Sequence, residues 1–222
     1  MAAMASLVQD VWLGWEPRLR GLRLAPWEAP RVRLLFHLDA GTTLEDGPVG
    51  PLLETLAGTL EVVAWEPRGQ GASAGRFGPE VLEDARYLAA AAGSRWGALP
   101  LVAGGLGLGG WLALALADLP GVRGAFALAP SLAAAGPEPS SPLRAALAAA
   151  FARSPLAVPT LLVEGRERPA AEAEAVTQWL AREPPASRLV AAGDDDAVLE
   201  PPWPAAVGAW ALAVGTADGR PS

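Results

Sequence analysis

The feature of this sequence that most constrains its fold is an uncharged, glycine-rich segment, Leu99–Ala117. An apolar run opens the segment, glycines crowd its centre from Gly104 to Gly110, and a second apolar run closes it. Glycine reaches backbone conformations that other residues avoid, and it interrupts helices and strands. The segment therefore predicts a buried strand, a tight turn and a buried helix, with no nucleophilic side chain on the turn.

The same region meets the length criterion for a membrane helix. Residues 96–117 have no charge, and about 20 apolar residues are enough to span a bilayer. Pro100 and the glycines lie in the middle of this stretch, where they would break a membrane helix. We therefore expect no membrane span.

Composition narrows the class of protein. With 222 residues, 51% of them hydrophobic and 18% charged, the chain has the size and composition of a single globular domain over residues 1–222. It has no cysteine, which excludes disulfides, thiolate catalysis and cysteine-based metal or iron-sulfur sites. The absence of a basic, apolar leader at the N-terminus predicts a cytoplasmic protein.

Charge argues against two further classes of function. The net charge is −7 and the 17 basic residues are scattered, whereas nucleic-acid binding needs a basic stripe to neutralise phosphates. Asp194–Asp196 forms a short acidic run, but three adjacent carboxylates cannot all point at one cation. We expect a solvated loop there, with no metal ion, no cofactor and no nucleic-acid partner.

Alternating patterns along the chain predict an α/β fold, with a mostly parallel central sheet and helices on both faces. An antiparallel pair, Val8–Trp15 and Arg18–Leu24, leads into the sheet. The expected buried strands are Val32–His37, Glu61–Trp65, Pro100–Gly104, Gly124–Ala129, Thr160–Glu164 and Arg188–Ala192. The expected helices are Val49–Ala57, Pro79–Ala92, Leu108–Ala117, Pro142–Arg153, Pro169–Arg182 and Pro204–Val214. Residues 130–158, rich in Ala, Pro and Ser, predict a short lid or cap.

The glycine turn fits two known templates. Gly105, Gly107 and Gly109 match the nucleophile elbow Gly-x-Ser-x-Gly, with glycine at the nucleophile position. Gly105, Gly107 and Gly110 match the dinucleotide fingerprint Gly-x-Gly-x-x-Gly. The fingerprint needs an acidic residue at the end of the next strand, but that strand ends in Phe126–Pro130 without a carboxylate. Context therefore favours the elbow.

From about residue 30 to 214, the chain resembles the α/β-hydrolase superfamily. Leu34–Gly41 is similar to the strand ending in His-Gly that supplies an oxyanion donor. Val63–Ser73 is similar to the Asp-x-Arg-Gly-x-Gly-x-Ser loop, with Glu66 in place of Asp, and Val102–Trp111 is similar to the elbow. The remaining two landmarks are Pro159–Pro169, which resembles the strand leading to the catalytic acid, and Ala191–Pro201, which resembles the segment that bears the histidine.

The resemblance places the three catalytic positions on residues that cannot perform the family's roles. Gly107 stands at the serine, Arg168 at the acid and Asp195 at the histidine. Nucleophilic acyl transfer needs a hydroxyl, a base and a carboxylate to orient that base. The His-Gly pair is also altered, because Leu38 replaces the glycine and Asp39 follows it, which puts a potential negative charge near any oxyanion.

A second Gly-x-Ser-x-Gly match, Gly71–Gly75, lies away from any direct strand-to-helix turn. The resemblance makes its central residue, Ser73, the structural serine of the Arg-Gly-x-Gly-x-Ser loop. Glu66 and Arg68 are expected to organise this loop.

His37 is the only histidine, so any imidazole base must be this residue. One interpretation gives His37 a purely structural role, as a strand-end residue hydrogen-bonded to nearby backbone. The functional one is an acid or base that faces a pocket above Gly107, together with Asp195 or Asp39.

These observations lead to two hypotheses. The first is an inactive pseudo-hydrolase that binds a small molecule or a protein partner. The alternative is a triad-independent hydrolase, cyclase or lyase that uses His37 and Asp195, or a hydrolase that uses Ser131. The residues expected around the pocket are His37, Leu38, Asp39, Leu106, Gly107, Leu108, Ser131 and Asp195.

Overall fold

The computed structural model describes residues 7–14, 16–132, 141–153, 158–167, 173–174, 176–178 and 186–217. Most of the expected helix Pro169–Arg182 lies outside these residues, as does Arg168. Within the expected lid, residues 130–158, the described part includes one helix, which covers Pro142–Arg153.

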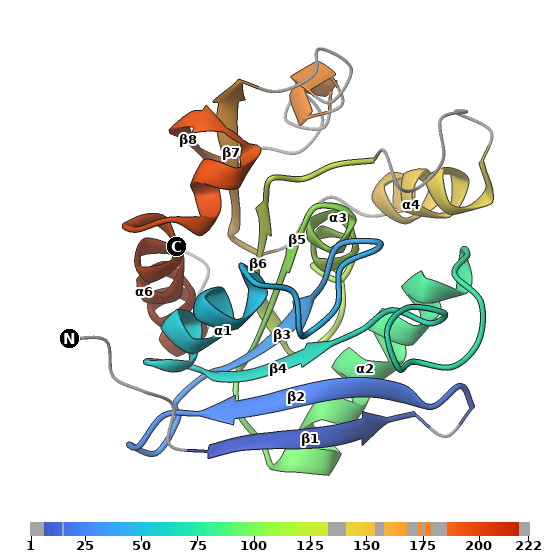
Figure 1. Cartoon of the computed structure of the whole chain (residues 1–222), viewed down its shortest axis with the longest axis vertical. Helices are drawn as coiled ribbons and strands as arrows, with labels where there is room; N and C mark the ends of the chain where they lie inside the picture. The colour runs from blue at the N-terminus through green and yellow to red at the C-terminus, as the bar shows by residue number, and fades with distance from the viewer. Residues whose placement is uncertain are drawn as a thin grey trace.

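An eight-stranded sheet forms the centre of the molecule (Figure 1). Its strands pair in the order β1-β2-β4-β3-β5-β6-β7-β8. The β1-β2 and β2-β4 pairs are antiparallel, and all the other pairs are parallel. The strands are β1 (Leu7–Leu13), β2 (Leu19–Ala25), β3 (Arg33–His37), β4 (Glu61–Trp65), β5 (Leu101–Leu106), β6 (Val122–Leu128), β7 (Thr160–Glu167) and β8 (Ala186–Asp194). The predicted α/β class, with its antiparallel leading pair, is confirmed.

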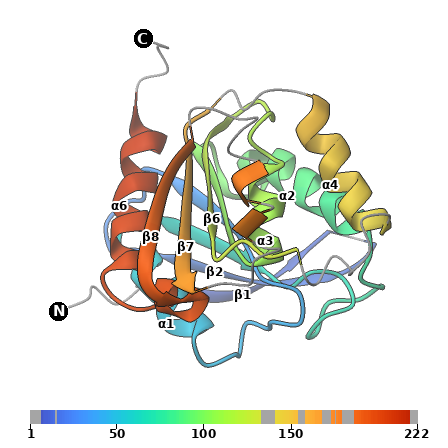
Figure 2. The same ribbon diagram turned by 90° about the horizontal axis from the view of Figure 1, so that it is seen from above.

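Helices cover both faces of the sheet (Figure 2). They are α1 (Val49–Ala57), α2 (Glu80–Trp96), α3 (Leu108–Leu114), α4 (Pro142–Arg153) and α6 (Trp203–Thr216), with a 3-10 helix η2 (Asp195–Leu199) after β8. Side chains of α1 and α6 pack in one core, and those of α2, α3 and α4 in the other. Among the described residues, no helix is long and apolar enough to cross a membrane.

Alternation along β3 explains how one strand serves both cores. Leu34 and Phe36 point to the α1 and α6 side, whereas Leu35 points to the α2 and α3 side. All five residues of β3 are buried, as expected for a central parallel strand. Successive side chains therefore alternate between the two cores, and the last residue, His37, shares the face of Leu35.

A buried ion pair fixes the start of β3 beside β4. The Arg33 guanidinium donates to both carboxylate oxygens of Glu61, and it also donates to the carbonyls of Ala92, Trp96 and Gly97 at the end of α2. Burial alone would raise the pKa of Glu61, but hydrogen bonds from Arg23 and Arg33 hold it below its usual range. This pair secures the strand whose other end leads into the candidate site.

Candidate functional site

The turn between β5 and α3 is a sharp elbow built on Gly107. This residue has φ 56° and ψ −122°, a conformation that favours glycine. Its N–H donates to the Leu128 carbonyl at 2.9 Å, and its carbonyl accepts from Gly110 at 3.1 Å. The strand, turn and helix predicted from Leu99–Ala117 are therefore present, although the helix ends at Leu114.

Two further glycines let the backbones of the elbow meet without side chains between them. A Cβ atom on Gly105 would lie 2.2 Å from the Gly109 carbonyl oxygen. A Cβ atom on Gly109 would lie 2.1 Å from the carbonyl oxygen of His37. The first turn of α3 thus rests directly on the ends of β5 and β3, which brings the residues that follow β3 to the elbow.

Asp39, two residues beyond β3, places its carboxylate against Gly107. A Cβ atom built on Gly107 would lie 2.2 Å from Asp39 Cγ, so the carboxylate fills the space of a side chain at this position. Its Oδ1 accepts hydrogen bonds from the backbone N–H of Leu108 at 2.7 Å and of Ala40 at 2.8 Å. In elbow hydrolases, the N–H of the residue after the nucleophile belongs to the oxyanion hole. Here that N–H binds the protein's own carboxylate.

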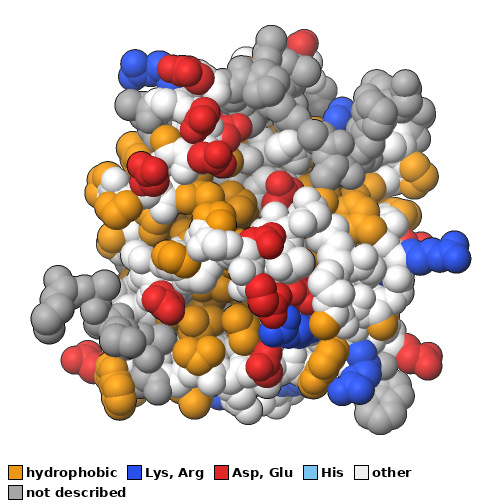
Figure 3. All heavy atoms as spheres, in the orientation of Figure 1, with side chains coloured by type: hydrophobic (Ala, Val, Ile, Leu, Met, Phe, Trp, Pro, Cys, Tyr) orange, Lys and Arg blue, Asp and Glu red, His pale blue; other side chains and the backbone are white. Residues whose placement is uncertain are grey.

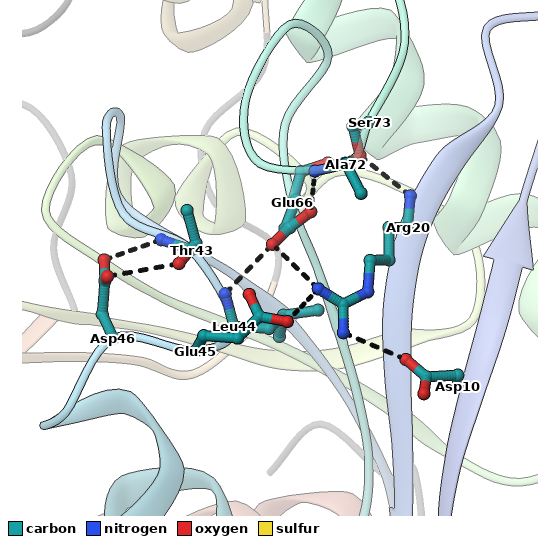
Figure 4. Close-up of polar contacts among 9 residues, drawn as sticks. All are labelled: Asp10, Arg20, Thr43, Leu44, Glu45, Asp46, Glu66, Ala72 and Ser73. Carbon is teal, nitrogen blue, oxygen red and sulfur yellow. Dashed lines mark hydrogen bonds and ion pairs between the residues drawn. The ribbon is translucent and has the colours of Figure 1, made fainter.

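Buried Glu66 holds the connection that contains Asp39. Its carboxylate accepts from the N–H of Leu44 at 3.2 Å and from the N–H of Ala72 at 2.8 Å (Figure 4). A Cβ atom on Gly71 would lie 2.4 Å from this carboxylate, and Gly71 has a positive φ of 51°. Glu66 therefore ties the loop after β3 to the loop after β4.

Arg20 on β2 joins three carboxylates from separate parts of the chain. Its guanidinium contacts Glu45, Asp10 at 3.2 Å and Glu66 at 3.7 Å (Figure 4). The hydrogen bond that Arg20 donates to Glu45 is the main cause that raises the pKa of Arg20, against a lowering by burial. Ser73 completes the network, because its hydroxyl donates to the Glu66 carbonyl and accepts from the Arg20 N–H, both at 2.8 Å.

A cleft of about 550 Å³ lies above the elbow. Four of its lining side chains are carboxylates, and none of the described lining residues is basic. Figure 3, in the orientation of Figure 1, likewise shows more acidic than basic side chains on this face. The described lining consists of Asp39, Thr42, Asp46, Gly47, Pro48, Val49, Leu106, Gly107, Ala129, Ser131, Asp195, Asp196 and Leu199.

The structure brings together most of the pocket residues expected from the sequence. Asp39, Leu106, Gly107, Ser131 and Asp195 all line the cleft. Asp195 Oδ1 also accepts from the Gly165 N–H at 2.9 Å, which links η2 to β7. In the described part of the chain, no group of three His, Asp or Glu side chains is placed to hold a metal ion.

Three expected pocket residues do not line the cleft. Leu38 and Leu108 are buried in the two opposite cores, so Leu108 reaches the site only through its backbone N–H. His37 is completely buried beside Trp65, whose indole N–H donates to His37 Nδ1 at 2.9 Å. Burial lowers the pKa of His37 to about 3. The expectation of an acid or base facing the pocket is wrong, because the alternation of β3 turns this side chain into the α2 and α3 core.

Other cleft residues were not anticipated from the sequence. Asp46 lies at the rim and caps its own loop, accepting from the N–H of Thr43 at 2.8 Å. Ala129, at the end of β6, has a φ of 42°, which is strained for a residue with a Cβ atom. The sequence Thr43-Leu-Glu-Asp46 could have indicated a local turn at Asp46, because Thr and Asp side chains favour turns. Nothing in the sequence indicated the strain at Ala129.

The contact between Asp39 and Gly107 predicts a coupling in stability. Gly107→Ala should cost more than the roughly 1–3 kcal/mol of backbone strain, because the new Cβ atom meets the Asp39 carboxylate. In an Asp39→Ala background, the loss should be smaller by about 0.5–3 kcal/mol. Urea denaturation of the four proteins measures this difference.

Gly121→Ala is the matched control for that cycle. Gly121 also has a positive φ, of 92°, but a Cβ atom there would meet nothing within 4 Å. Its cost should be the same with and without Asp39→Ala. Equal costs of Gly107→Ala in the two backgrounds would contradict the contact.

Comparison with known proteins adds information on the fold. No family model matches the sequence, and no curated protein matches it significantly. Many solved structures are similar in fold. An esterase from Pyrococcus furiosus superposes with a TM-score of 0.72 at 14% identity, covering 94% of this chain and 91% of the esterase.

Two further solved structures are similar to this chain in fold. An alpha-beta serine hydrolase homologue from Coxiella burnetii gives a TM-score of 0.68 at 18% identity, over 95% of this chain and 97% of that one. A predicted CIB-like hydrolase from Thermoplasma acidophilum gives a TM-score of 0.65 at 17% identity, over 93% of this chain and 97% of that one. The strand order, the elbow and these superpositions show that the chain has the α/β-hydrolase fold.

Proposed function

We propose that this protein is a catalytically inactive member of its fold, a pseudo-hydrolase that binds a small molecule in the cleft above Gly107. The observation that supports this most strongly is the Asp39 carboxylate. It occupies the space of an elbow side chain and accepts from the Leu108 N–H, which would otherwise face a developing oxyanion. A fixed negative charge at this point opposes the tetrahedral intermediate of acyl transfer.

Among the described residues, the other groups needed for acyl transfer do not meet at the elbow. Gly107 offers no hydroxyl, and Arg168, at the acid position of the resemblance, lies outside the described residues. His37, the only histidine, is buried, accepts from Trp65 through Nδ1 and has a pKa of about 3. It therefore cannot serve as a base in the cleft.

Two described residues of the cleft lining carry a hydroxyl, Thr42 and Ser131, and the hydrolase alternative rests on Ser131. Ser131 lines the cleft beside Ala129 and Asp195. In the Ser-His-Asp arrangement an imidazole takes the proton of the attacking hydroxyl, and the described lining contains no imidazole. This supports a binding role for Ser131 rather than a nucleophilic one.

The first test is chemical labelling of the natural protein with a fluorophosphonate, alongside hydrolysis of p-nitrophenyl acetate. We expect no labelled serine and no hydrolysis above buffer, because nucleophile, base and free oxyanion donor do not coincide. The Gly107→Ser variant should also stay silent, since Asp39 fills the space of the new side chain.

A serine esterase run alongside shows that the reagents are active. A labelled peptide from the natural protein, or ester hydrolysis that Ser131→Ala abolishes, would replace this proposal with an enzymatic function.

Binding in the cleft is tested with three ligands that share one ring and differ in charge: benzylamine, benzyl alcohol and benzoate. The carboxylates of the lining should make benzylamine raise the melting temperature most and benzoate least. Thermal unfolding with each ligand measures the order.

The Leu106→Trp variant serves as the control for these ligands. Leu106 lines the cleft, so the larger tryptophan side chain should fill part of the cleft volume. It should remove the stabilisation by benzylamine. Stabilisation by benzoate alone, or an effect of benzylamine that survives Leu106→Trp, would contradict binding in this cleft.

A further inference from the structure

A second pocket lies away from the elbow, where the connection between β2 and β3 meets the ends of α1 and α6. It has a volume of about 380 Å³. In Figure 1 this connection lies on the same side of the molecule as α1 and α6. The described lining consists of Pro26, Trp27, Glu28, Ala29, Arg31, Gly58, Thr59 and Leu212.

Trp27 is the protruding part of this surface. Its side chain is 77% exposed, the largest exposure of any bulky hydrophobic residue in the described chain. Large exposed aromatic side chains are common anchors of protein interfaces, because they bury much apolar area on contact. The surface therefore has a projecting indole beside a hollow.

The helix that borders the pocket adds an uncharged face. All residues of α6, from Trp203 to Thr216, are uncharged. Its exposed positions include Ala205, Ala206, Ala209 and Ala213. Because each chain has a net charge of −7, two copies repel one another over most of their surfaces, and an uncharged face is where that repulsion is weakest.

Two exposed charges of opposite sign line the same pocket as Trp27. Glu28 and Arg31 both line the pocket, and neither makes an ion pair with another described residue. A two-fold axis brings the same patch of both subunits together, so a patch must complement itself. A projection next to a hollow, and an acid next to a base, satisfy that condition.

We propose that two copies of this chain associate through this surface about a two-fold axis. The Trp27 indole of each copy enters the pocket of the other, and Glu28 of each copy faces the partner's Arg31. This interaction goes beyond the proposed binding function and does not depend on it, because the pocket and the cleft have no described lining residue in common.

The mass of the full chain in solution tests the proposal. Sedimentation at tens of micromolar should give twice the chain mass of 22.8 kDa for the natural protein, and the chain mass for Trp27→Ala. Trp12→Ala, at another exposed tryptophan, is the control and should remain a dimer. A natural protein that is monomeric, or a dimer unaffected by Trp27→Ala, would overturn the proposal.

Charge-reversal variants at Glu28 and Arg31 provide a second, independent test of the dimer. Glu28→Arg or Arg31→Glu alone should weaken self-association about tenfold or more, since like charges then face each other across the axis. The double variant restores opposite charges and should recover the natural affinity. Failure of the double variant to recover, with circular dichroism spectra that match the natural protein, would overturn the reciprocal arrangement.

Discussion

The first turn of α3 lies directly on the end of β3, and the backbones of the two elements meet with no side chain between them. A Cβ atom on Gly109 would collide with the His37 carbonyl, so only glycine permits the approach. The residues that follow β3 are thereby delivered to the elbow. This contact determines the position of Gly107, the direction of the Leu108 N–H and the place at which Asp39 enters the site.

Asp39 and Gly107 form one structural unit, because the Asp39 carboxylate occupies the side-chain space at Gly107. The sharp strand-to-helix turn at Gly107 is the kind of turn on which elbow hydrolases present a nucleophile. Here the side-chain space belongs to a carboxylate from a neighbouring loop, and that loop is held by Glu66 and Arg20. The fold thus keeps the geometry of the elbow while the charge at its centre is opposite to what acyl transfer requires.

Much of the fold could be predicted from the sequence, because the central strands are apolar on both faces and glycine or proline separates them from the helices. Strand Glu61–Trp65 and helices Val49–Ala57 and Pro142–Arg153 have the predicted bounds. The candidate site is less predictable from the sequence than the fold. The cleft is assembled from loops that are distant in sequence, and the side to which His37 points depends on the register of β3, which the sequence leaves open by one residue.

The most direct measurement of the central claim is the NMR signal of the Leu108 amide. A hydrogen bond to the Asp39 carboxylate should shift its proton downfield and protect it from solvent exchange. In Asp39→Ala, the Leu108 and Ala40 amides should move upfield and exchange faster, while the Gly110 amide, bonded to the Gly107 carbonyl, should keep its position. An unchanged Leu108 amide in Asp39→Ala would contradict a carboxylate bound at the elbow.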